Sequence, residues 1–168
     1  INALIEQIIR IQSLQMQQYN IDNLENEAVD ICEIINEIGQ DVCFEFQHKN
    51  IHWQWQPNPS LLPDSCTVMG NQEQLHSALE NIIRNAFMHT AVDLKVLTDI
   101  HAVKMNNKIA AIEISITDEG GGVAEQDLER IFQPFVRLDT ARHRRTGGYG
   151  LGLAIVHAVV MAHKGQIT

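Results

Sequence analysis

The segment Leu79-Glu-Asn-Ile-Ile-Arg-Asn-Ala86 carries apolar residues at helical spacing and places a carboxamide, Asn85, near its end. The spacing predicts a helix over about residues 72 to 89. The amide oxygen of Asn85 is a neutral ligand of the kind that completes the shell of a Mg²⁺ ion already balanced by phosphates. We therefore expect a metal-nucleotide site, with Asn85 as its metal ligand.

A second cluster, Asp118-Glu-Gly-Gly-Gly122, follows an alternating apolar run that predicts a strand. The carboxylate of Asp118 would then lie at the strand end, where it can accept a hydrogen bond from an exocyclic amine. Gly120 and Gly122 lack the Cβ atoms that would block a planar base. The cluster therefore predicts the base-binding part of a nucleotide site.

A third cluster, Gly148-Tyr-Gly-Leu-Gly152, precedes a run with helical apolar character. Backbone N–H groups at the start of a helix bind phosphate. Two other phosphate motifs can be excluded: no Gly-x-x-x-x-Gly-Lys-Ser/Thr occurs anywhere, and the dinucleotide fingerprint fails because position 153 is Leu. A flexible loop is the alternative for this cluster taken alone.

In this order and spacing, the clusters resemble the catalytic ATP-binding domain of sensor histidine kinases, over residues 71 to 165. That domain belongs to a superfamily shared with Hsp90, type II topoisomerases and MutL. The matching motifs are the N box (79–86), the G1 box (118–122), the F box Ile131-Phe-Gln-Pro-Phe135 and the G2 box (148–153). Residues 141–156 resemble most closely the envelope-stress sensors of the Cpx type.

The resemblance implies roles for individual residues. It makes Asn81, Asn85 and Arg137 the catalytic residues. The residues that it assigns to binding ATP, with Mg²⁺ on Asn85, are Asn85, His89, Asp118, Gly120, Gly122, Phe135, Arg142, Gly148, Gly150, Leu151, Gly152 and Leu153. At position 89 the chain departs from the family, because many relatives have a tyrosine near the nucleotide there.

The charge of the chain is acidic overall and basic in one place. A net charge of −9 and a pI near 5.2 argue against nucleic acid as a partner, since phosphate backbones are bound through clustered Lys and Arg. Four arginines and His143 fall between the F and G2 boxes: Arg137, Arg142, Arg144 and Arg145. By resemblance this stretch, about residues 138 to 147, is a mobile ATP lid; an ordinary solvated loop is the alternative.

Cysteine usage and hydropathy bear on the compartment. Cys32 and Cys43 are expected on one helix, about 16 Å apart at about 1.5 Å per residue, which is too far for a disulfide. We therefore predict reduced thiols and a cytosolic compartment. No stretch approaches the about 18 apolar residues of a membrane span. The resemblance implies the cytoplasmic domain of an inner-membrane sensor protein.

The N-terminal residues predict a separate element. Apolar residues at a/d-like spacing over residues 1 to 20 predict a long amphipathic helix that needs a partner. By resemblance, residues 1–27 are the end of the dimerisation and phosphotransfer helix plus a linker, and residues 28–168 are the catalytic domain, truncated before its last strands. The alternative for the helix is an ordinary element folded onto the core.

The remaining pattern predicts a two-layer α/β sandwich, in which three helices cover one face of a mixed sheet, after the long N-terminal helix. Gly39 interrupts the first helix of the domain and should weaken it by about 1 kcal/mol relative to Ala. The other expected elements are a helix over 28–49, a strand over 51–55, a hairpin of 94–101 with 109–117, a short helix over 126–131 and a last helix to His163.

None of the eight histidines lies in the acceptor box that the family phosphorylates. The resemblance therefore implies transfer of the γ-phosphoryl group of ATP to a histidine on a dimerisation hairpin absent from these residues. It also implies three partners: that hairpin, the receiver domain of a response regulator, and a second copy of the full-length protein in a homodimer.

Two alternatives remain open at this point. ATP-hydrolysing clamps of the superfamily carry a glutamate four residues before the N-box asparagine, where it activates water. Here Asn81 occupies that position, which favours phosphotransfer over hydrolysis. A regulatory pseudokinase that binds ATP without turnover is the second alternative.

Overall fold

The computed structural model describes residues 26–55, 66–105, 108–138 and 150–168, which form two compact units. We call them the sheet unit (26–55, 66–72, 83–105 and 108–122) and the helical unit (73–82, 123–138 and 150–168). The predicted N-terminal helix lies outside the described residues. The predicted domain boundary at residue 27 therefore stays a prediction.

Most of the regular structure belongs to the sheet unit. Its elements are β1 (Glu27–Asp30), α2 (Ile31–Glu45), η2 (Gln47–Lys49), β2 (His52–Trp55), β3 (Thr67–Gly70), β4 (Lys95–Met105) and β5 (Lys108–Asp118). The helix α3 (Gln72–His89) runs through both units. The helical unit adds η4 (Glu125–Asp127), η5 (Arg130–Phe132) and α5 (Gly152–Ala162).

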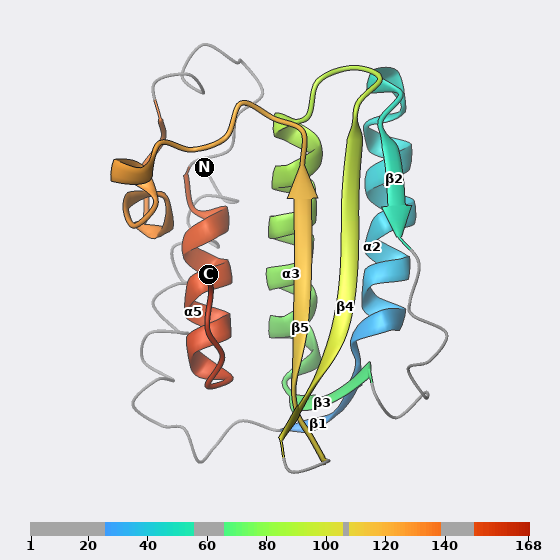
Figure 1. The fold of residues 1–168 in the computed structure, drawn as a ribbon, viewed down its shortest axis with the longest axis vertical. Helices are drawn as coiled ribbons and strands as arrows, with labels where there is room; N and C mark the ends of the chain where they lie inside the picture. Colours follow the sequence, from blue (N-terminus) through green and yellow to red (C-terminus); the bar gives the residue numbers. More distant parts are fainter. Residues whose placement is uncertain (1–25, 56–65, 106–107, 139–149) are drawn as a thin grey trace. The chain divides into compact units, whose positions relative to one another are not determined.

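The main sheet has the strand order β2-β4-β5 and is mixed, because β2 runs parallel to β4 and β5 runs antiparallel to it. On β4, Val96, Thr98 and Ile100 alternate onto one face and are buried. The helices α2 and α3 lie behind that face (Figure 1). The predicted α/β class, with helices packed on a mixed sheet, is confirmed.

The helix α2 begins at Ile31 because Asp30 caps it. The Oδ1 atom of Asp30 accepts hydrogen bonds from the backbone N–H groups of Cys32 (2.9 Å) and Glu33 (3.2 Å). The buried side of the helix is entirely apolar and comprises Ile31, Ile34, Ile35, Ile38, Gly39 and Val42. This stripe at helical spacing is what packs α2 within the sheet unit.

Trp53 on β2 explains the glycine in α2. A Cβ atom built on Gly39 would lie 1.8 Å from the Cη2 atom of Trp53, so the indole occupies the place of a side chain. The indole is held there by its Nε1–H group, which donates to Thr98 Oγ1 at 3.1 Å. Glycine lowers the helix propensity at position 39, but it allows the indole of Trp53 to pack directly against the backbone of α2.

Two local predictions were wrong. The first helix was expected over residues 28–49, but residues 27–30 form β1, which pairs with β3 in a separate antiparallel sheet. The helix also ends at Glu45, and Gln47–Lys49 form the separate 3₁₀ turn η2. The short F-box helix is instead two 3₁₀ turns, η4 and η5. A segment this short cannot offset the cost of nucleating an α-helix, which isolated helices recover only over about 12 residues or more.

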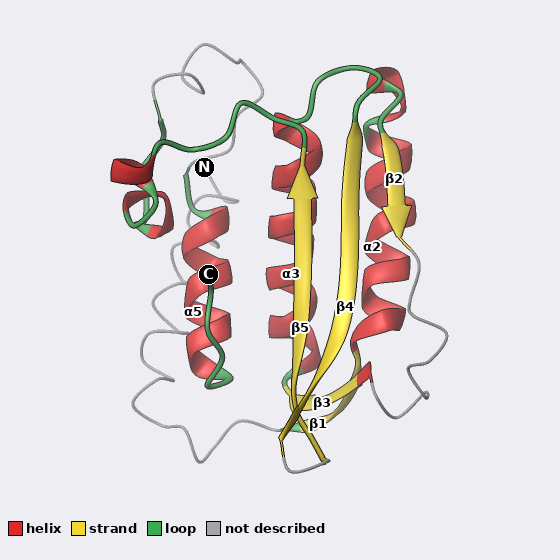
Figure 2. Ribbon diagram, in the orientation of Figure 1, coloured by secondary structure: helices red, strands yellow, loops and turns green. Residues whose placement is uncertain are grey.

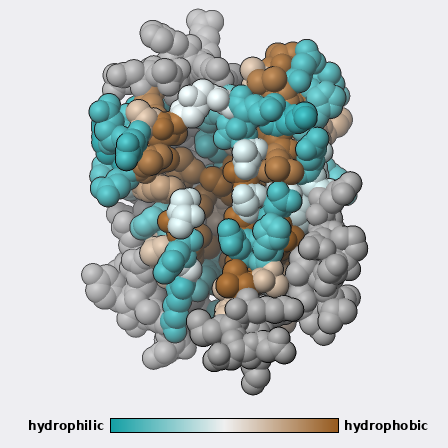
Figure 3. Space-filling view, viewed as in Figure 1, coloured by the Kyte–Doolittle hydropathy of each residue, from teal (hydrophilic) through white to brown (hydrophobic). Residues whose placement is uncertain are grey.

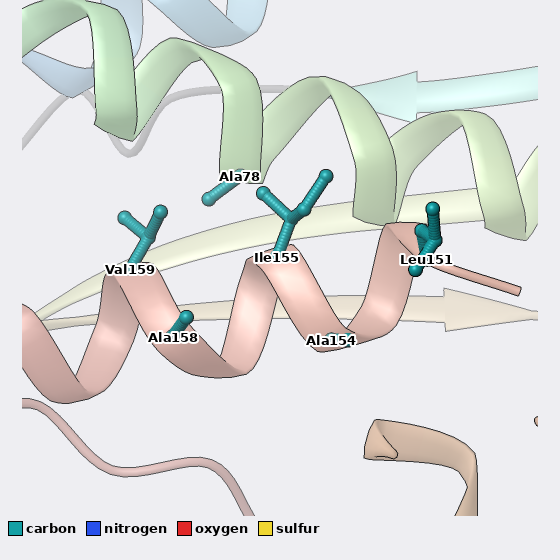
Figure 4. Packing of buried hydrophobic residues seen from close by; sticks show 6 residues of the cluster. All are labelled: Ala78, Leu151, Ala154, Ile155, Ala158 and Val159. Carbon is teal, nitrogen blue, oxygen red and sulfur yellow. The ribbon is translucent and has the colours of Figure 1, made fainter. Parts of the chain in front are cut away.

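The helical unit has its own core, which forms where α5 meets the N-terminal half of α3. Buried residues of α5 and Ala78 of α3 form one cluster (Figure 4), and the partly buried Leu75 packs against it. The residues that α5 and its preceding loop contribute are Leu151, Ala154, Ile155, Ala158 and Val159. Ala78, Ala154 and Ala158 each contribute only a methyl group to this core.

The outer face of the main sheet mixes hydrophilic and hydrophobic surface (Figure 3). On β4 this face carries Leu97, which is 37% exposed, and Val103, which is 43% exposed. The alternation of buried and exposed residues along β4 is that of a strand with one face toward the core.

All three cysteines are free thiols, as predicted. Burial, and next a hydrogen bond with Cys66, raise the pKa of Cys32 to about 12. Burial also raises the pKa of Cys43. Both groups therefore stay protonated at neutral pH, where they are weak nucleophiles.

Replacement of Gly39 by alanine tests the contact with Trp53. Helix propensity alone predicts that Gly39→Ala stabilises the protein by about 1 kcal/mol. We expect the opposite, a loss of about 1–3 kcal/mol, because the new methyl group must displace the indole from a packed position. The measurement is the free energy of unfolding by chemical denaturation.

Gly121→Ala is the matched control, because a Cβ atom there would meet nothing within 4 Å. We expect it to leave the free energy of unfolding unchanged or slightly raised. A Gly39→Ala variant that is more stable than the unmodified protein would contradict the packing described for Trp53.

Candidate nucleotide-binding site

The last turns of α3 carry two of the predicted site residues. Ile83, Ala86 and Phe87 are buried and anchor this part of the helix. Asn85 is half-buried, and His89, the last helical residue, is exposed. The predicted bounds of this helix are confirmed, and the amphipathic pattern explains why Asn85 lies at the margin of the buried face.

Asp118 is the last residue of β5, as the alternating run predicts. Its cross-strand partner is Val96, which is fully buried. Directly paired residues of an antiparallel sheet project to the same face. Asp118 therefore lies on the face of the sheet that carries the core, at the strand end, where it remains exposed to solvent.

A loop that contains the three glycines follows the end of β5, which is drawn in Figure 2. The backbone N–H group of Gly120 donates to Asp118 Oδ1 at 2.7 Å. A Cβ atom at Gly120 would lie 2.5 Å from that oxygen and 3.0 Å from the carbonyl oxygen of His89. Any side chain at position 120 would therefore push the loop away from both Asp118 and the end of α3.

Gly122 is a glycine for a different reason. Its φ angle is +68°, in the left-handed region, and a Cβ atom there would meet nothing within 4 Å. The space beside Gly122 is thus open. Nearby, Glu119 Oε2 accepts the backbone N–H group of Lys95 at 2.8 Å, which ties the loop to the start of β4.

Lys49 is a residue of this region that sequence reasoning missed. Its Nζ atom donates to the carbonyl oxygens of Phe87 (2.9 Å), Met88 (2.8 Å) and Thr90 (3.0 Å) at the end of α3. These partners lie 38 to 41 residues away along the chain. No local pattern could have indicated the contact.

In the helical unit, the F and G2 boxes meet at Gly150. The N–H group of Phe135 donates to the carbonyl oxygen of Gly150 at 2.8 Å. Gly150 has a φ angle of +74°, and a Cβ atom there would lie 2.8 Å from the carbonyl oxygen of Val136 and 3.2 Å from Cγ of Arg137. Phe135 is 58% exposed, whereas Arg137 is half-buried.

Asn81 contacts the start of α5 within the same unit. Its Nδ2 atom donates to the carbonyl oxygen of Ser77 at 2.8 Å, and its Oδ1 atom lies 2.8 Å from where a Cβ atom of Gly152 would be. Leu151 is buried in the core of the unit, while Leu153 is half-buried. Leu151 is therefore a packing residue in this structure.

The structure thus brings the predicted residues together in two groups. Asp118, Gly120 and the end of α3 at His89 meet in the sheet unit. In the helical unit, Asn81 meets Gly152, and the F-box loop meets Gly150. Arg142 and Gly148 lie outside the described residues. The same holds for the predicted lid, residues 138 to 147, except for its first residue.

The fold and the order of the four boxes along it define an ATPase domain of the α/β class. A family model described as "Histidine kinase-, DNA gyrase B-, and HSP90-like ATPase" matches residues 70–168. The chain belongs to this family, which confirms the resemblance found in the sequence. Membership of an ATPase family implies that the domain binds ATP.

Sensor histidine kinases are among the proteins that the chain is similar to. The chain is 35% identical over 148 residues to the sensor histidine kinase CpxA of Escherichia coli K12, a match that covers 86% of the chain and 29% of CpxA. The chain thus spans less than a third of that curated relative. These names favour the histidine kinase over the clamp among the alternatives left open by the sequence.

Solved structures agree with the fold. The mycobacterial sensor histidine kinase MprB matches with a TM-score of 0.67 and 27% identity, over 83% of this chain and 80% of that one. Full-length ShkA in complex with AMPPNP matches with a TM-score of 0.73 and 26% identity, over 95% of this chain and 30% of that one. Among the described residues, no helix is both long and apolar enough to cross a membrane.

Proposed function

We propose that the chain is the ATP-binding catalytic domain of a sensor histidine kinase and supplies the γ-phosphoryl group of ATP to a histidine on a dimerisation hairpin. The observation that carries the proposal is the joining of Asp118, Gly120 and the end of α3 in the sheet unit. The supporting comparison is the family match over residues 70–168.

Asp118 is proposed to recognise the adenine base. Its Oδ1 atom is held by the N–H group of Gly120, which fixes the orientation of the carboxylate. The second oxygen can then accept a hydrogen bond from the exocyclic amine of adenine. This charge-assisted contact favours a base that has a hydrogen-bond donor at that position over a base that has an acceptor there. The open space beside Gly122 provides room for the ring, and His89 is proposed to contact the nucleotide from the end of α3.

The donor set on α3 fits a magnesium ion. Mg²⁺ takes oxygen ligands and usually retains waters and substrate phosphates beside one or two protein ligands. Asn85 offers one amide oxygen at a half-buried position, so it would hold the ion without adding a charge. When bound, the ion neutralises negative charge on the phosphates.

The start of α5 is proposed to bind the phosphates. The N–H groups of Gly152 and Leu153 belong to the first turn of a helix, which favours anions through its orphan donors and its dipole. Arg137, Arg142 and Gly148 complete the proposed phosphate contacts, with Arg137 counted among the catalytic residues.

Asn81 supports phosphotransfer over hydrolysis. The amide cannot act as a general base, and its nitrogen is already bonded to the carbonyl oxygen of Ser77. With Asn81 oriented in this way, the domain has no base at the position that clamps of the superfamily use to activate water. Catalysis would then consist of positioning the γ-phosphoryl group and neutralising its charge.

The proposed partners follow from the sensor kinases that the chain resembles. They are the dimerisation hairpin, the receiver domain of a response regulator, and a second copy of the whole protein in a homodimer. The domain would lie on the cytoplasmic side of a membrane sensor. The acidic charge of the chain gives no support to nucleic acid as a partner.

Replacement of Asp118 by asparagine tests base recognition. We expect Asp118→Asn to reduce ADP affinity at least about tenfold, because the amide loses the charge-assisted bond and can present a donor to a donor. The measurement is calorimetric titration with ADP. Asp99→Asn is the matched control, since Asp99 lies at an odd-numbered position of β4, on the face opposite to Asp118. Equal affinity in a folded Asp118→Asn variant would contradict the proposed role.

A separately supplied dimerisation hairpin tests the reaction. We expect the chain alone to acquire no label from γ-labelled ATP, since none of its eight histidines lies in an acceptor box. With the hairpin present, label should appear on the hairpin histidine at a rate that rises with hairpin concentration. Rapid release of phosphate without hairpin would instead support the clamp.

A further inference from the structure

Every backbone carbonyl of the last turn of α3 has an identifiable neighbour. Helices end with four carbonyl groups that lack partners within the helix. Here the carbonyl of Ala86 accepts from Thr90, both from its N–H group (3.0 Å) and from its Oγ1 (2.9 Å). The carbonyls of Phe87 and Met88 accept from Lys49 Nζ. The carbonyl of His89 is the one that faces Gly120.

Lys49 reaches this position from a tightly fixed turn. Its N–H group donates to the carbonyl oxygen of Phe46 at 2.9 Å, and its own carbonyl accepts the N–H group of Asp93 at 3.0 Å. The next residue, Asn50, has a φ angle of 49° and donates from Nδ2 to Asp93 Oδ1 at 2.8 Å. The side chain of Lys49 therefore starts from a backbone that is tied to the segment following α3.

The charge of Lys49 suits the end of the helix. The carbonyl groups there carry the negative pole of the helix dipole, which a cation stabilises. The ammonium group also lies 5.3 Å from the centre of the Phe46 ring, whose face attracts cations. The three backbone carbonyls that Lys49 Nζ contacts match in number the three N–H donors of an ammonium group.

We propose that Lys49 is a positioning residue of the nucleotide site. Lys49 holds the carbonyls of residues 87, 88 and 90, and thereby keeps the carbonyl of His89 close to the Gly120 loop. The N–H group of Gly120 in that loop orients the carboxylate of Asp118. Lys49 acts through these groups and does not touch the nucleotide. The inference rests on the proposed function, because it concerns the affinity of the proposed base site.

The experiment compares Lys49→Met with Arg84→Met in the complete 168-residue chain. Both variants remove a cation that ties α3 to another segment of the sheet unit, but Arg84 does so through Glu45 on α2. Three quantities are measured: the free energy of unfolding, the affinity for ADP with Mg²⁺, and the backbone amide signal of Gly120 in nuclear magnetic resonance spectra without nucleotide.

Lys49→Met should shift the Gly120 amide signal and weaken ADP binding about tenfold at a temperature where the variant is folded, because small displacements of a positioned group are costly. Arg84→Met should lose stability while both the Gly120 signal and the ADP affinity stay near those of the unmodified chain. Unchanged affinity in folded Lys49→Met, or equal losses of affinity in both variants, would overturn the positioning role.

If the Lys49→Met variant does not fold, the Lys49→Arg variant tests the positioning role instead. Arginine keeps the charge at the helix end but presents a planar fork, which does not match three carbonyls arranged around one nitrogen. The expected result is a folded protein with a shifted Gly120 signal and a smaller loss of affinity; an unmodified affinity would overturn the proposal. Failure of the unmodified chain to bind ADP would instead count against the proposed function itself.

Discussion

The close approach of Gly120 to the end of α3 is the constraint on which the base site proposed in the sheet unit depends. A Cβ atom at position 120 would lie 3.0 Å from the carbonyl oxygen of His89, so the loop passes the helix end too closely to carry a side chain. Asp118 takes its orientation from the same loop, through the N–H group of Gly120. A helix that ended one residue earlier or later would present a different carbonyl to the loop and would move the carboxylate.

Glycines serve this fold in three physically distinct ways. At positions 39 and 120 they allow an indole ring and a carbonyl group, respectively, to approach the backbone. At Gly122, in open space, the φ angle of +68° alone favours glycine. At Gly150 both reasons apply, because a positive φ angle coincides with a contact 2.8 Å from the carbonyl of Val136. A glycine-rich motif is therefore a set of separate requirements.

Sequence reasoning succeeded where the pattern is local. The bounds of α3 follow from apolar residues that recur with a period of 3.6 along the helix. The end of β5 at Asp118 follows from apolar residues that alternate along the strand. It failed where an element depends on a distant segment. The strand β1 has only four residues and is stabilised by pairing with β3, about forty residues further along the chain. The role of Trp53 at Gly39 and the contact of Lys49 with the end of α3 also join distant segments. Of the candidate site, the motif residues could be predicted, but the side chain that holds the helix end could not.

The central claim, that the end of α3 and the Asp118 loop form the base site of an ATP-binding domain, can be tested directly by mapping ADP binding with backbone amide spectra. Titration of ADP with Mg²⁺ into the chain should shift the amide signals of Gly120, Gly122 and His89 in proportion to occupancy. The amides of Asp99 and His101, on the outer face of β4, should stay in place. Large shifts on the outer face, with the Gly120 loop unchanged, would contradict the account.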